Sequence, residues 1–367
     1  MSPATRQALL VIGGGPAGAA AACAARAAGL SVAVLERGAT PQPDACPGWL
    51  GPAAVRTCTA YGVTAAEVGA VEFHGLRLRS WDLKQCVDVH APELSGWIVE
   101  PSRLSAALLA AARRAGAEVQ TEAEVTALHL GEDAVSAEIR SGDVAEGQIA
   151  LLADGASSQT AAAAHLLPAQ RIAGPGGGAL ATWDVPSAVP GVEVLIGAGR
   201  ALRVATIVRG AGQVRLYAHT RDTTAPVGTQ LMMLVAAAQA AGVLPAEPPG
   251  LSRPGLLLGG TALELESHVG KRVLLIGSAG GFVAALSQEG IYPALRSGQL
   301  AVETAVRALA APLLQDELMS FGAAWRADLA DYLRMPNTDL GLLMPLVFGN
   351  PQMSRRVARA FLLGKTF

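Results

Sequence analysis

Three glycines near the N-terminus, spaced as Gly13-x-Gly15-x-x-Gly18, constrain the fold more than any other feature of this sequence. They follow an apolar run at 9–12 and open an alanine-rich stretch at 16–28, which predicts a buried strand, a tight turn and a helix. In this arrangement Gly13 makes the turn, Gly15 lets a pyrophosphate approach the backbone, and Gly18 lets the helix lie close to the strand. The segment therefore predicts a parallel α/β unit that binds a dinucleotide at a helix N-terminus.

A second apolar run, residues 31–35, ends at an acidic residue that completes this pattern. Glu36 stands 18 positions after the last of the three glycines, close to the roughly 20 expected of a carboxylate that binds the adenosine ribose. We expect the dinucleotide to lie on Pro16 and Ala17, because the start of a helix has free N–H groups and partial positive charge. The pair Glu36-Arg37 favours FAD, but this segment alone is compatible with either FAD or NAD.

The same N-terminal stretch has no charged residue from Ala8 to Ala25, as a signal peptide or a membrane span would. The run Gly-Gly-Gly-Pro at 13–16 would break a membrane helix. We therefore expect folded sequence here and a cytoplasmic protein.

Composition excludes several other classes of protein. Hydrophobic residues make up 51% and charged residues 16% of the chain, against about 25% charged in an average soluble protein, so a large core can be filled. The net charge of -2 gives no support for binding nucleic acid through a basic surface. The four cysteines show neither CxxC spacing nor a ligand pattern with histidine, so neither a metal site nor a disulfide framework is predicted.

A second glycine-rich segment lies in the last third of the chain. Residues 273–300 read VLLIGSAGGFVAALSQEGIYPALRSGQL, which predicts a buried strand that ends in glycine and is followed by a helix. This segment resembles the second FAD motif of the geranylgeranyl reductase family, part of the para-hydroxybenzoate hydroxylase-like group of flavoproteins. The resemblance implies that Gly277 and Ser278 lie by the ribityl chain and pyrophosphate. It also implies that a helix starting at Gly290-Ile291 points at the flavin, where its N–H groups stabilise negative charge on the reduced ring.

Four shorter segments resemble other parts of the same family. Arg103 is implied to reach FAD phosphate or ribityl groups, Asp154 to lie beside the flavin, and the Val125 backbone to meet adenine. The Cys-Pro-Gly-Trp-Leu segment at 46–50 resembles the loop over the reductases' active site, so Cys46 and Trp49 are candidate catalytic residues. Each also has a structural interpretation, since Cys46 would suit a small apolar loop position and Trp49 a core position.

The sequence departs from the family at three places. Ser278 stands where the second motif has aspartate, which removes a charge-assisted hydrogen bond to a ribityl hydroxyl. Residues 159–161 follow the Asp-Gly segment where hydroxylases have an arginine, so direct recognition of NADPH is not predicted. Residues 216–219 stand roughly where the reductases have a Trp-x-Phe-Pro substrate motif, and the Trp-x-Trp-x-Ile-Pro of flavin halogenases is absent.

These motifs predict an α/β fold with a Rossmann-type FAD-binding domain, an interleaved β-rich substrate domain and C-terminal helices. Pro336, Pro345 and Pro351 are expected to interrupt those helices. We assign 1–70, 101–165 and 270–315 to a discontinuous FAD-binding domain, 71–100 and 166–269 to the substrate domain, and 316–367 to the helical region.

The resemblance implies an FAD-dependent oxidoreductase. The first hypothesis is a reductase, in which hydride from flavin N5 reduces a carbon–carbon double bond of an apolar substrate. The alternative is a monooxygenase that hydroxylates an aromatic or alkene group, and a third is a flavin-holding partner whose substrate is carried on another protein. An external electron donor, NAD(P)H or a reductase, is expected.

The C-terminal tail is basic. Arg355, Arg356, Arg359 and Lys365 have no acidic residue among or after them. Such a helix is typical either of peripheral contact with a membrane surface or of a solvated helix face.

Overall fold

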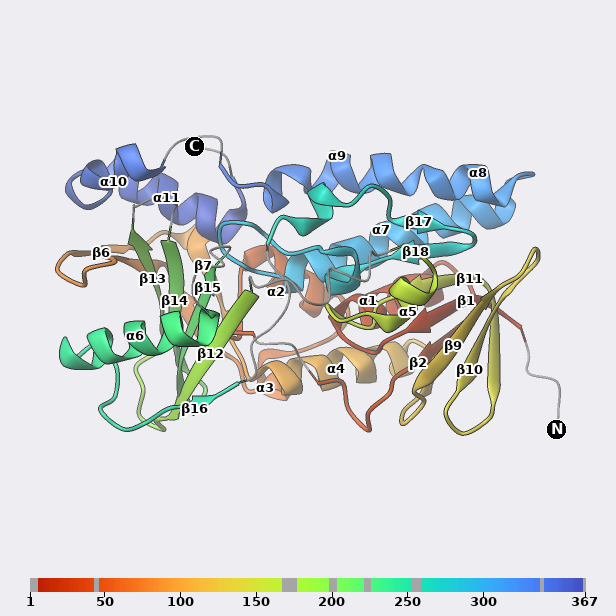
Figure 1. Cartoon of the computed structure of the whole chain (residues 1–367), viewed down its shortest axis with the longest axis horizontal. Coiled ribbons are helices and arrows are strands. Elements are labelled where there is room, and N and C mark those ends of the chain that lie inside the picture. Colours follow the sequence, from red (N-terminus) through yellow and green to blue (C-terminus); the bar gives the residue numbers. More distant parts are fainter. Residues whose placement is uncertain are drawn as a thin grey trace.

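The computed structural model describes residues 6–42, 46–166, 177–197, 203–220, 226–252, 259–336 and 340–365. Figure 1 shows two units side by side along the long axis of the molecule, one α/β and one rich in β-strands. The chain passes between them more than once, as the alternating motifs predicted.

An eight-stranded sheet forms the centre of the α/β unit. Its order is β17-β18-β11-β1-β2-β8, with β10 pairing to β11 and β9 pairing to β10. The strands β18, β11, β1, β2 and β8 run parallel, with Leu10 opposite both Ala33 and Ala150. The strands are β1 (Gln7–Ile12), β2 (Val32–Leu35), β8 (Glu118–Gln120), β9 (Val125–Leu130), β10 (Val135–Ile139), β11 (Val144–Leu152), β17 (Val269–Gly270) and β18 (Val273–Leu275).

Alternation along β1 explains how both faces of this sheet are covered. Leu9 and Val11 pack into a core with helices α1 (Pro16–Ala27), α4 (Pro101–Arg114) and α7 (Ile291–Ala310). Leu10 and Ile12 pack on the opposite face against β9, β10 and the short helix α5 (Gln159–Ala163). The predicted order of strand, glycine turn, helix and strand is confirmed, because β1, α1 and β2 follow one another with β1 and β2 paired in parallel.

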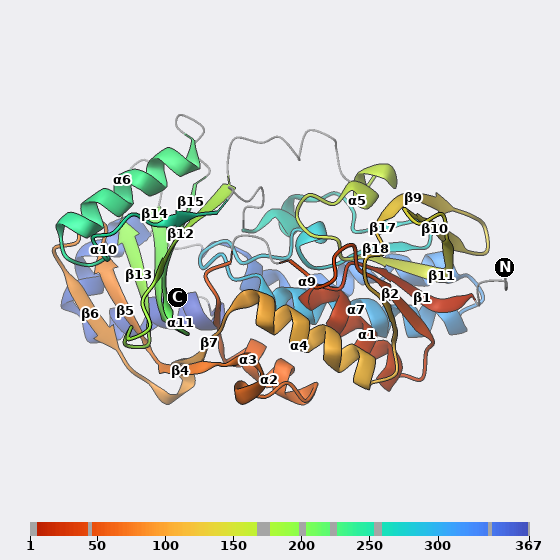
Figure 2. The same ribbon diagram turned by 90° about the horizontal axis from the view of Figure 1, so that it is seen from below.

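The β-rich unit is built on a seven-stranded sheet in the order β16-β12-β15-β14-β13-β5-β6. Neighbouring strands are antiparallel except for β13 and β5, which are parallel. Helix α6 (Val227–Ala240) covers one face, and α10 (Leu340–Gly349) and α11 (Pro351–Leu363) cover the other, as Figure 2 shows. The strands are β5 (Leu76–Ser80), β6 (Cys86–Val89), β12 (Gly177–Asp184), β13 (Gly191–Gly197), β14 (Arg203–Gly210), β15 (Gln213–Thr220) and β16 (Gly250–Leu251).

A three-stranded sheet, ordered β3-β7-β4, joins the two units. Its strands are β3 (Trp49–Leu50), β7 (Ser95–Ile98) and β4 (Val71–His74), and helices α2 (Pro52–Ala60) and α3 (Ala65–Val68) lie between β3 and β4 in the chain. The segment 71–100, assigned to one domain from the sequence, thus contributes strands to two sheets. The domain boundaries stay a prediction.

The C-terminal helices divide between the two units. Helices α8 (Leu314–Met319) and α9 (Phe321–Leu333) bury Leu318, Phe321 and Trp325 in the core around α7. Helix α11 instead buries Val357 and Phe361 against the seven-stranded sheet. Because the apolar side of α11 is used inside the protein, it is not available to insert into a membrane surface.

The expectation that Pro345 interrupts a helix is wrong. Pro345 lies inside α10, whereas Pro351 occupies the first turn of α11. A proline inside a helix removes one hydrogen bond, and tertiary packing offsets that loss here because Val347 of the same helix is fully buried.

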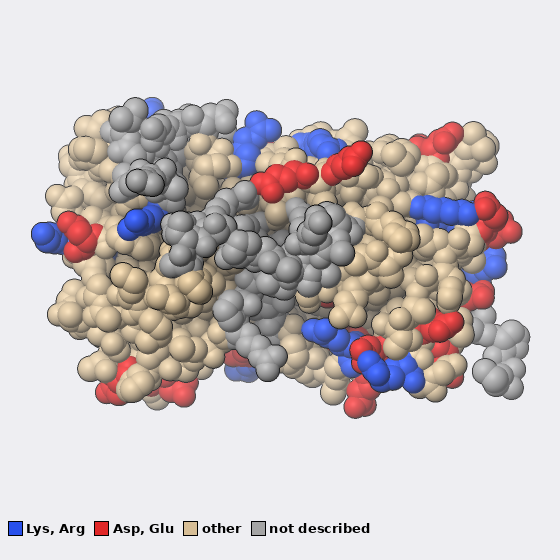
Figure 3. All heavy atoms as spheres, viewed as in Figure 1, with Lys and Arg blue, Asp and Glu red and all other residues tan. Residues whose placement is uncertain are grey.

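Basic and acidic side chains are scattered among uncharged residues on the face shown in Figure 3, several of them next to opposite charges. Among the exposed ion pairs of the described residues, Arg77–Asp88 and Arg140–Glu124 each have a closest approach of 2.7 Å. In the part of the chain that the structure describes, no helix is long and apolar enough to cross a membrane.

Candidate cofactor and active site

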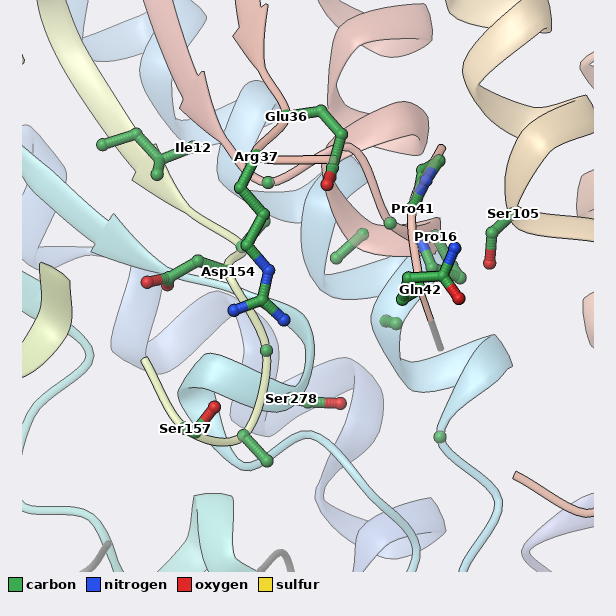
Figure 4. Close-up of a pocket in the computed structure, with 18 of the residues that line it drawn as sticks. Ile12, Pro16, Glu36, Arg37, Pro41, Gln42, Ser105, Asp154, Ser157 and Ser278 are labelled. Atoms are coloured by element: carbon green, nitrogen blue, oxygen red, sulfur yellow. The ribbon is translucent and has the colours of Figure 1, made fainter. Parts of the chain in front are cut away.

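A cavity of about 280 Å³ opens at the carboxyl ends of β1, β2 and β11. This is the edge where parallel α/β sheets bind their ligands. Figure 4 shows side chains from the glycine motif, from the ends of strands and from loops grouped round it, with Arg37 extending across the centre of the view. The lining includes the predicted residues Gly13, Gly15, Pro16, Ala17, Glu36, Arg37, Cys46, Val125, Asp154, Ser278, Gly290 and Ile291.

The three glycines of the first motif have different steric surroundings. A Cβ on Gly13, whose φ is +102°, would stand 2.4 Å from the Ala153 carbonyl oxygen. A Cβ on Gly18 would stand 1.9 Å from the Gly13 oxygen, so α1 could not approach the turn. A Cβ on Gly15 would meet no atom within 4 Å and would project into the cavity. Gly15 therefore leaves a cradle beside the N-terminus of α1, which fits a pyrophosphate.

Glu36 lines the cavity and also forms hydrogen bonds with the backbone of the glycine turn. Its side chain is buried at the end of β2 and accepts hydrogen bonds from the Gly14 N–H at 2.8 Å and the Gly38 N–H at 2.9 Å. With Arg37 and Val125 it forms the end of the cavity where adenosine is expected. Its carboxylate is thus positioned by the backbone on both sides.

Asp154 follows the end of β11 and is one of the residues that line the cavity. It accepts hydrogen bonds from the Ser158 hydroxyl at 2.5 Å and the Thr160 hydroxyl at 2.8 Å. Burial raises the pKa of this carboxyl, and the two hydroxyl donors oppose that shift. Within this segment Asp154 therefore has hydroxyl donors and no charged partner.

The second motif is brought against the first by close packing. Gly277 has a φ of +57°, and a Cβ there would lie 2.6 Å from the Ala17 Cβ. Gly277 thus supports the contact between the second motif and α1, while its neighbour Ser278 lines the cavity. Both predicted residues are near the first motif, but only Ser278 of the two faces the cavity.

Helix α7 starts at the cavity, and an acidic residue lies just before its N-terminus. Gly290 and Ile291 line the cavity. Glu289, buried just before them, accepts a hydrogen bond from the Tyr292 N–H at 2.8 Å. Burial raises the pKa of Glu289 to about 7, against the lowering effect of its hydrogen bonds to Tyr292 and Tyr332. Glu289 was not among the predicted site residues, and its signal in the sequence was an acidic residue directly before the Gly290-Ile291 helix start.

Cys46 and Trp49 lie in different environments. Cys46 lines the cavity, together with Pro47 of the same loop. Trp49 is 2% exposed and stacks on Phe361 of α11 with ring centroids 5.3 Å apart. Trp49 is not among the described residues that line the cavity, so the structure gives it the core position that was the alternative interpretation.

Arg103 does not lie where the resemblance placed it. Its exposed side chain points to α3, where the guanidinium is 3.5 Å from the Glu67 carbonyl oxygen. Pro101 and Ser105 of the same helix line the cavity instead. A contact between Arg103 and a phosphate or ribityl group has no support in this geometry.

Tyr217 and Gln288 also line the cavity, and neither was among the predicted site residues. Tyr217 lies on β15, in the segment that replaces the reductases' substrate motif, which was the available signal. Among the described residues no group of three or more His, Cys, Asp and Glu side chains is placed to hold a metal ion.

Comparison with known proteins defines the class. A family model described as an FAD binding domain matches residues 6–197, just over half of the chain. The chain belongs to this family, its cofactor is FAD, and its class is that of the FAD-dependent oxidoreductases. No curated protein matches the chain at a significant level of sequence similarity.

Solved structures share the fold along nearly the whole chain. A geranylgeranyl bacteriochlorophyll reductase-like protein from Thermoplasma acidophilum has a TM-score of 0.74 and 19% identity, covering 98% of this chain and 95% of that one. A flavoprotein/dehydrogenase from Cytophaga hutchinsonii has a TM-score of 0.72 and 17% identity, with 97% and 92% covered. PqsL of Pseudomonas aeruginosa, a probable FAD-dependent monooxygenase, has a TM-score of 0.66 and 17% identity, with 95% and 98% covered. The predicted class and fold are confirmed.

Proposed function

We propose that this protein uses FAD to reduce a carbon–carbon double bond of an apolar substrate. The observation that most supports the proposal is one cavity that extends from the pyrophosphate cradle at Gly15 to the Cys46 thiol and the Tyr217 ring. The cavity lining also includes Pro47 and Val283, whose apolar side chains suit an apolar substrate.

Reduced FAD, when bound, supplies a hydride at N5. The chain has to hold the substrate, exclude water and provide the proton that completes the reduction. Cys46 and Tyr217 both have a proton on a heteroatom at this end of the cavity, so either could donate it. Burial of Tyr217, which is 6% exposed, keeps that end dry.

We propose an external electron donor, either NAD(P)H or a reductase. Ala156 and Ser157 line the cavity after Asp154, and neither offers the positive charge that would bind a nicotinamide dinucleotide phosphate directly. This supports a donor that does not depend on an arginine in this segment.

A monooxygenase that hydroxylates an aromatic or alkene group is the second candidate. It is supported by the similar fold of the probable monooxygenase PqsL. In either reaction the substrate could be presented by a carrier protein.

Oxygen dependence separates the two reactions. The purified protein is reduced with dithionite under anaerobic conditions and mixed with a twenty-carbon polyprenyl alcohol as probe, and the visible flavin absorbance is followed. The proposal predicts that the probe reoxidises the flavin without oxygen and gains two hydrogens. Product that forms only with oxygen present, and that contains labelled oxygen from it, contradicts the reductase.

We also propose that the protein works in the cytoplasm. Cys23, Cys46, Cys58 and Cys86 form no disulfide with one another. Burial raises the pKa of the Cys23 thiol to about 11 and that of Cys58 to about 12, so these two thiols are unreactive. Reduced cysteines are typical of that compartment.

A further inference from the structure

Arg215 is a buried arginine on β15 that contacts the loop carrying Cys46. Arg215 is only 3% exposed. One terminal nitrogen donates to the Val99 carbonyl at 2.7 Å and to the Pro47 carbonyl at 3.3 Å. The Nε and the other terminal nitrogen both donate to the Gln213 side-chain oxygen, at 2.9 and 2.8 Å. The guanidinium therefore connects β15 to the backbone just after β7 and to the loop through one rigid group.

The loop is shaped to receive this group. Gly48 has a φ of +80°, and a Cβ on it would stand 2.3 Å from the Arg215 guanidinium and 2.4 Å from the Val99 oxygen. The Val99 N–H donates to the Gly48 oxygen at 2.8 Å, and this hydrogen bond also fixes the position of the loop. Only a residue without a side chain allows the loop and the guanidinium to come this close.

Arg215 and Tyr217 lie on the same face of β15, because alternate residues of a strand point the same way. The residues between and beside them, Val214, Leu216 and Ala218, pack in the core under α6 on the opposite face. Tyr217 lines the cavity, and Cys46 lines it next to Pro47, which Arg215 holds. The same strand thus supports both groups at the active end of the cavity.

The charge of Arg215 also lies beside this end. Burial lowers the pKa of the guanidinium, while the neighbouring groups Cys46 and Glu100 raise it. Glu100 itself is at the start of α4, where it accepts hydrogen bonds from the Ser102 and Arg103 N–H groups. The neutral acceptors Gln213, Val99 and Pro47 hold the guanidinium in place.

We propose that Arg215 is a positioning residue of the active site. Its forked guanidinium fixes the Cys46–Gly48 loop to β15 and so sets the position of the Cys46 thiol relative to the Tyr217 ring. This deepens the proposed reduction, since it names a residue that positions one of its two proton donors. The clamp itself is independent of which reaction the flavin supports.

Thiol alkylation tests the clamp in the full chain. Iodoacetamide labels the protein, and peptide mass spectrometry gives the rate at Cys46 relative to Cys86, an exposed cysteine on β6 that serves as an internal reference. Arg215→Lys keeps the positive charge but has no planar fork, so we expect the Cys46 to Cys86 ratio to rise about tenfold, as the loss of charge-assisted hydrogen bonds implies.

A second variant and a control make the result specific. Gln213→Leu removes the acceptor that orients the guanidinium, and we expect the ratio to rise in the same direction by less. Arg209→Lys alters another partly buried arginine of the same sheet, on β14, which binds Glu193 and the Val243 carbonyl. We expect its ratio to match that of the wild type.

The proposal is overturned if Arg215→Lys and Gln213→Leu label like the wild type, or if Arg209→Lys raises the ratio as much as they do. Bound FAD is measured on the same samples, and we expect Arg215→Lys to keep it. A wild-type protein without flavin would contradict the proposed function and leave the labelling result to decide the clamp on its own.

Discussion

The Tyr332 hydroxyl donates a hydrogen bond of 3.0 Å to the buried carboxylate of Glu289. The other carboxylate oxygen accepts from the Tyr292 N–H in the first turn of α7. An ionised Glu289 would offset the positive end of the helix that starts at the cavity, whereas a protonated one would leave it in place. The protonation state of one glutamate thus affects the field at the end of the cavity where the flavin is expected.

Glu289→Gln is predicted to change how stability depends on pH. Burial raises the pKa of Glu289 from 4.5 to about 7, so the folded chain holds a proton that the unfolded chain releases. Stability from this group is complete below pH 4.5 and is lost as pH rises through about 7. We expect the amide to stabilise the protein at about pH 8 by up to about 3 kcal/mol, and by much less at about pH 5.

Urea unfolding at both pH values, followed by circular dichroism, measures this difference. The groups facing Glu289 are Tyr292, Tyr332 and Cys58, all of which have pKa values raised by burial and so stay neutral over this range. If the free energies of unfolding of variant and wild type differ by the same amount at both pH values, the prediction is contradicted.

Gly15→Val is predicted to abolish FAD binding without unfolding the protein. A side chain at Gly15 meets no protein atom within 4 Å but enters the cradle where the pyrophosphate is expected. Gly191→Val on β13 is the matched control, since its Cβ also meets nothing within 4 Å and lies outside the cavity lining. The flavin to protein absorbance ratio checks both, and a Gly15→Val protein that retains a full complement of FAD would refute the role of this glycine.

Gly18→Ala is predicted to destabilise the fold. The added Cβ would stand 1.9 Å from the Gly13 oxygen, so α1 must shift away from the turn, at a cost of about 1–3 kcal/mol. Gly228→Ala in α6 is the control, because that Cβ meets nothing within 4 Å and alanine favours a helix by up to about 1 kcal/mol. The unfolding temperature should fall for Gly18→Ala and rise for Gly228→Ala. A shift of the same sign in both variants would count against the close approach of α1 to the Gly13 turn.

Trp49→Ala is predicted to cost stability, in contrast to Cys46→Ser. Removing a buried ring that stacks on Phe361 should lower the free energy of unfolding by about 3–5 kcal/mol. Cys46→Ser in the cavity wall should change it by no more than about 0.5 kcal/mol while lowering turnover. Denaturant unfolding separates the two residues, and a stable Trp49→Ala protein with impaired turnover would restore Trp49 as a catalytic candidate.

The parts of the site that are local in sequence were predictable. Gly13, Gly15, Gly18 and Glu36 lie within one strand-turn-helix-strand segment, where spacing alone fixes their arrangement. The strand end at Asp154 was predictable for the same reason, since parallel strands present their carboxyl ends at one edge.

The phase of a helix and contacts between distant segments were not predictable. Pro101 and Ser105 are four residues apart and face the cavity together, whereas Arg103, two residues from each, lies about 200° around the helix from them. Trp49 is buried by Phe361, which is more than 300 positions away in the sequence. The sequence pattern within one segment shows neither which side of α4 faces the cavity nor which distant residue packs on Trp49.

The central claim is that the cavity between the two glycine motifs holds FAD. Titration of the purified wild-type chain, stripped of any bound flavin, with FAD and separately with NAD tests it most directly, with flavin fluorescence and equilibrium dialysis as the two readouts. The account predicts saturation at one FAD per chain and no comparable binding of NAD. A chain that folds normally but binds no FAD, or that prefers NAD, would contradict it.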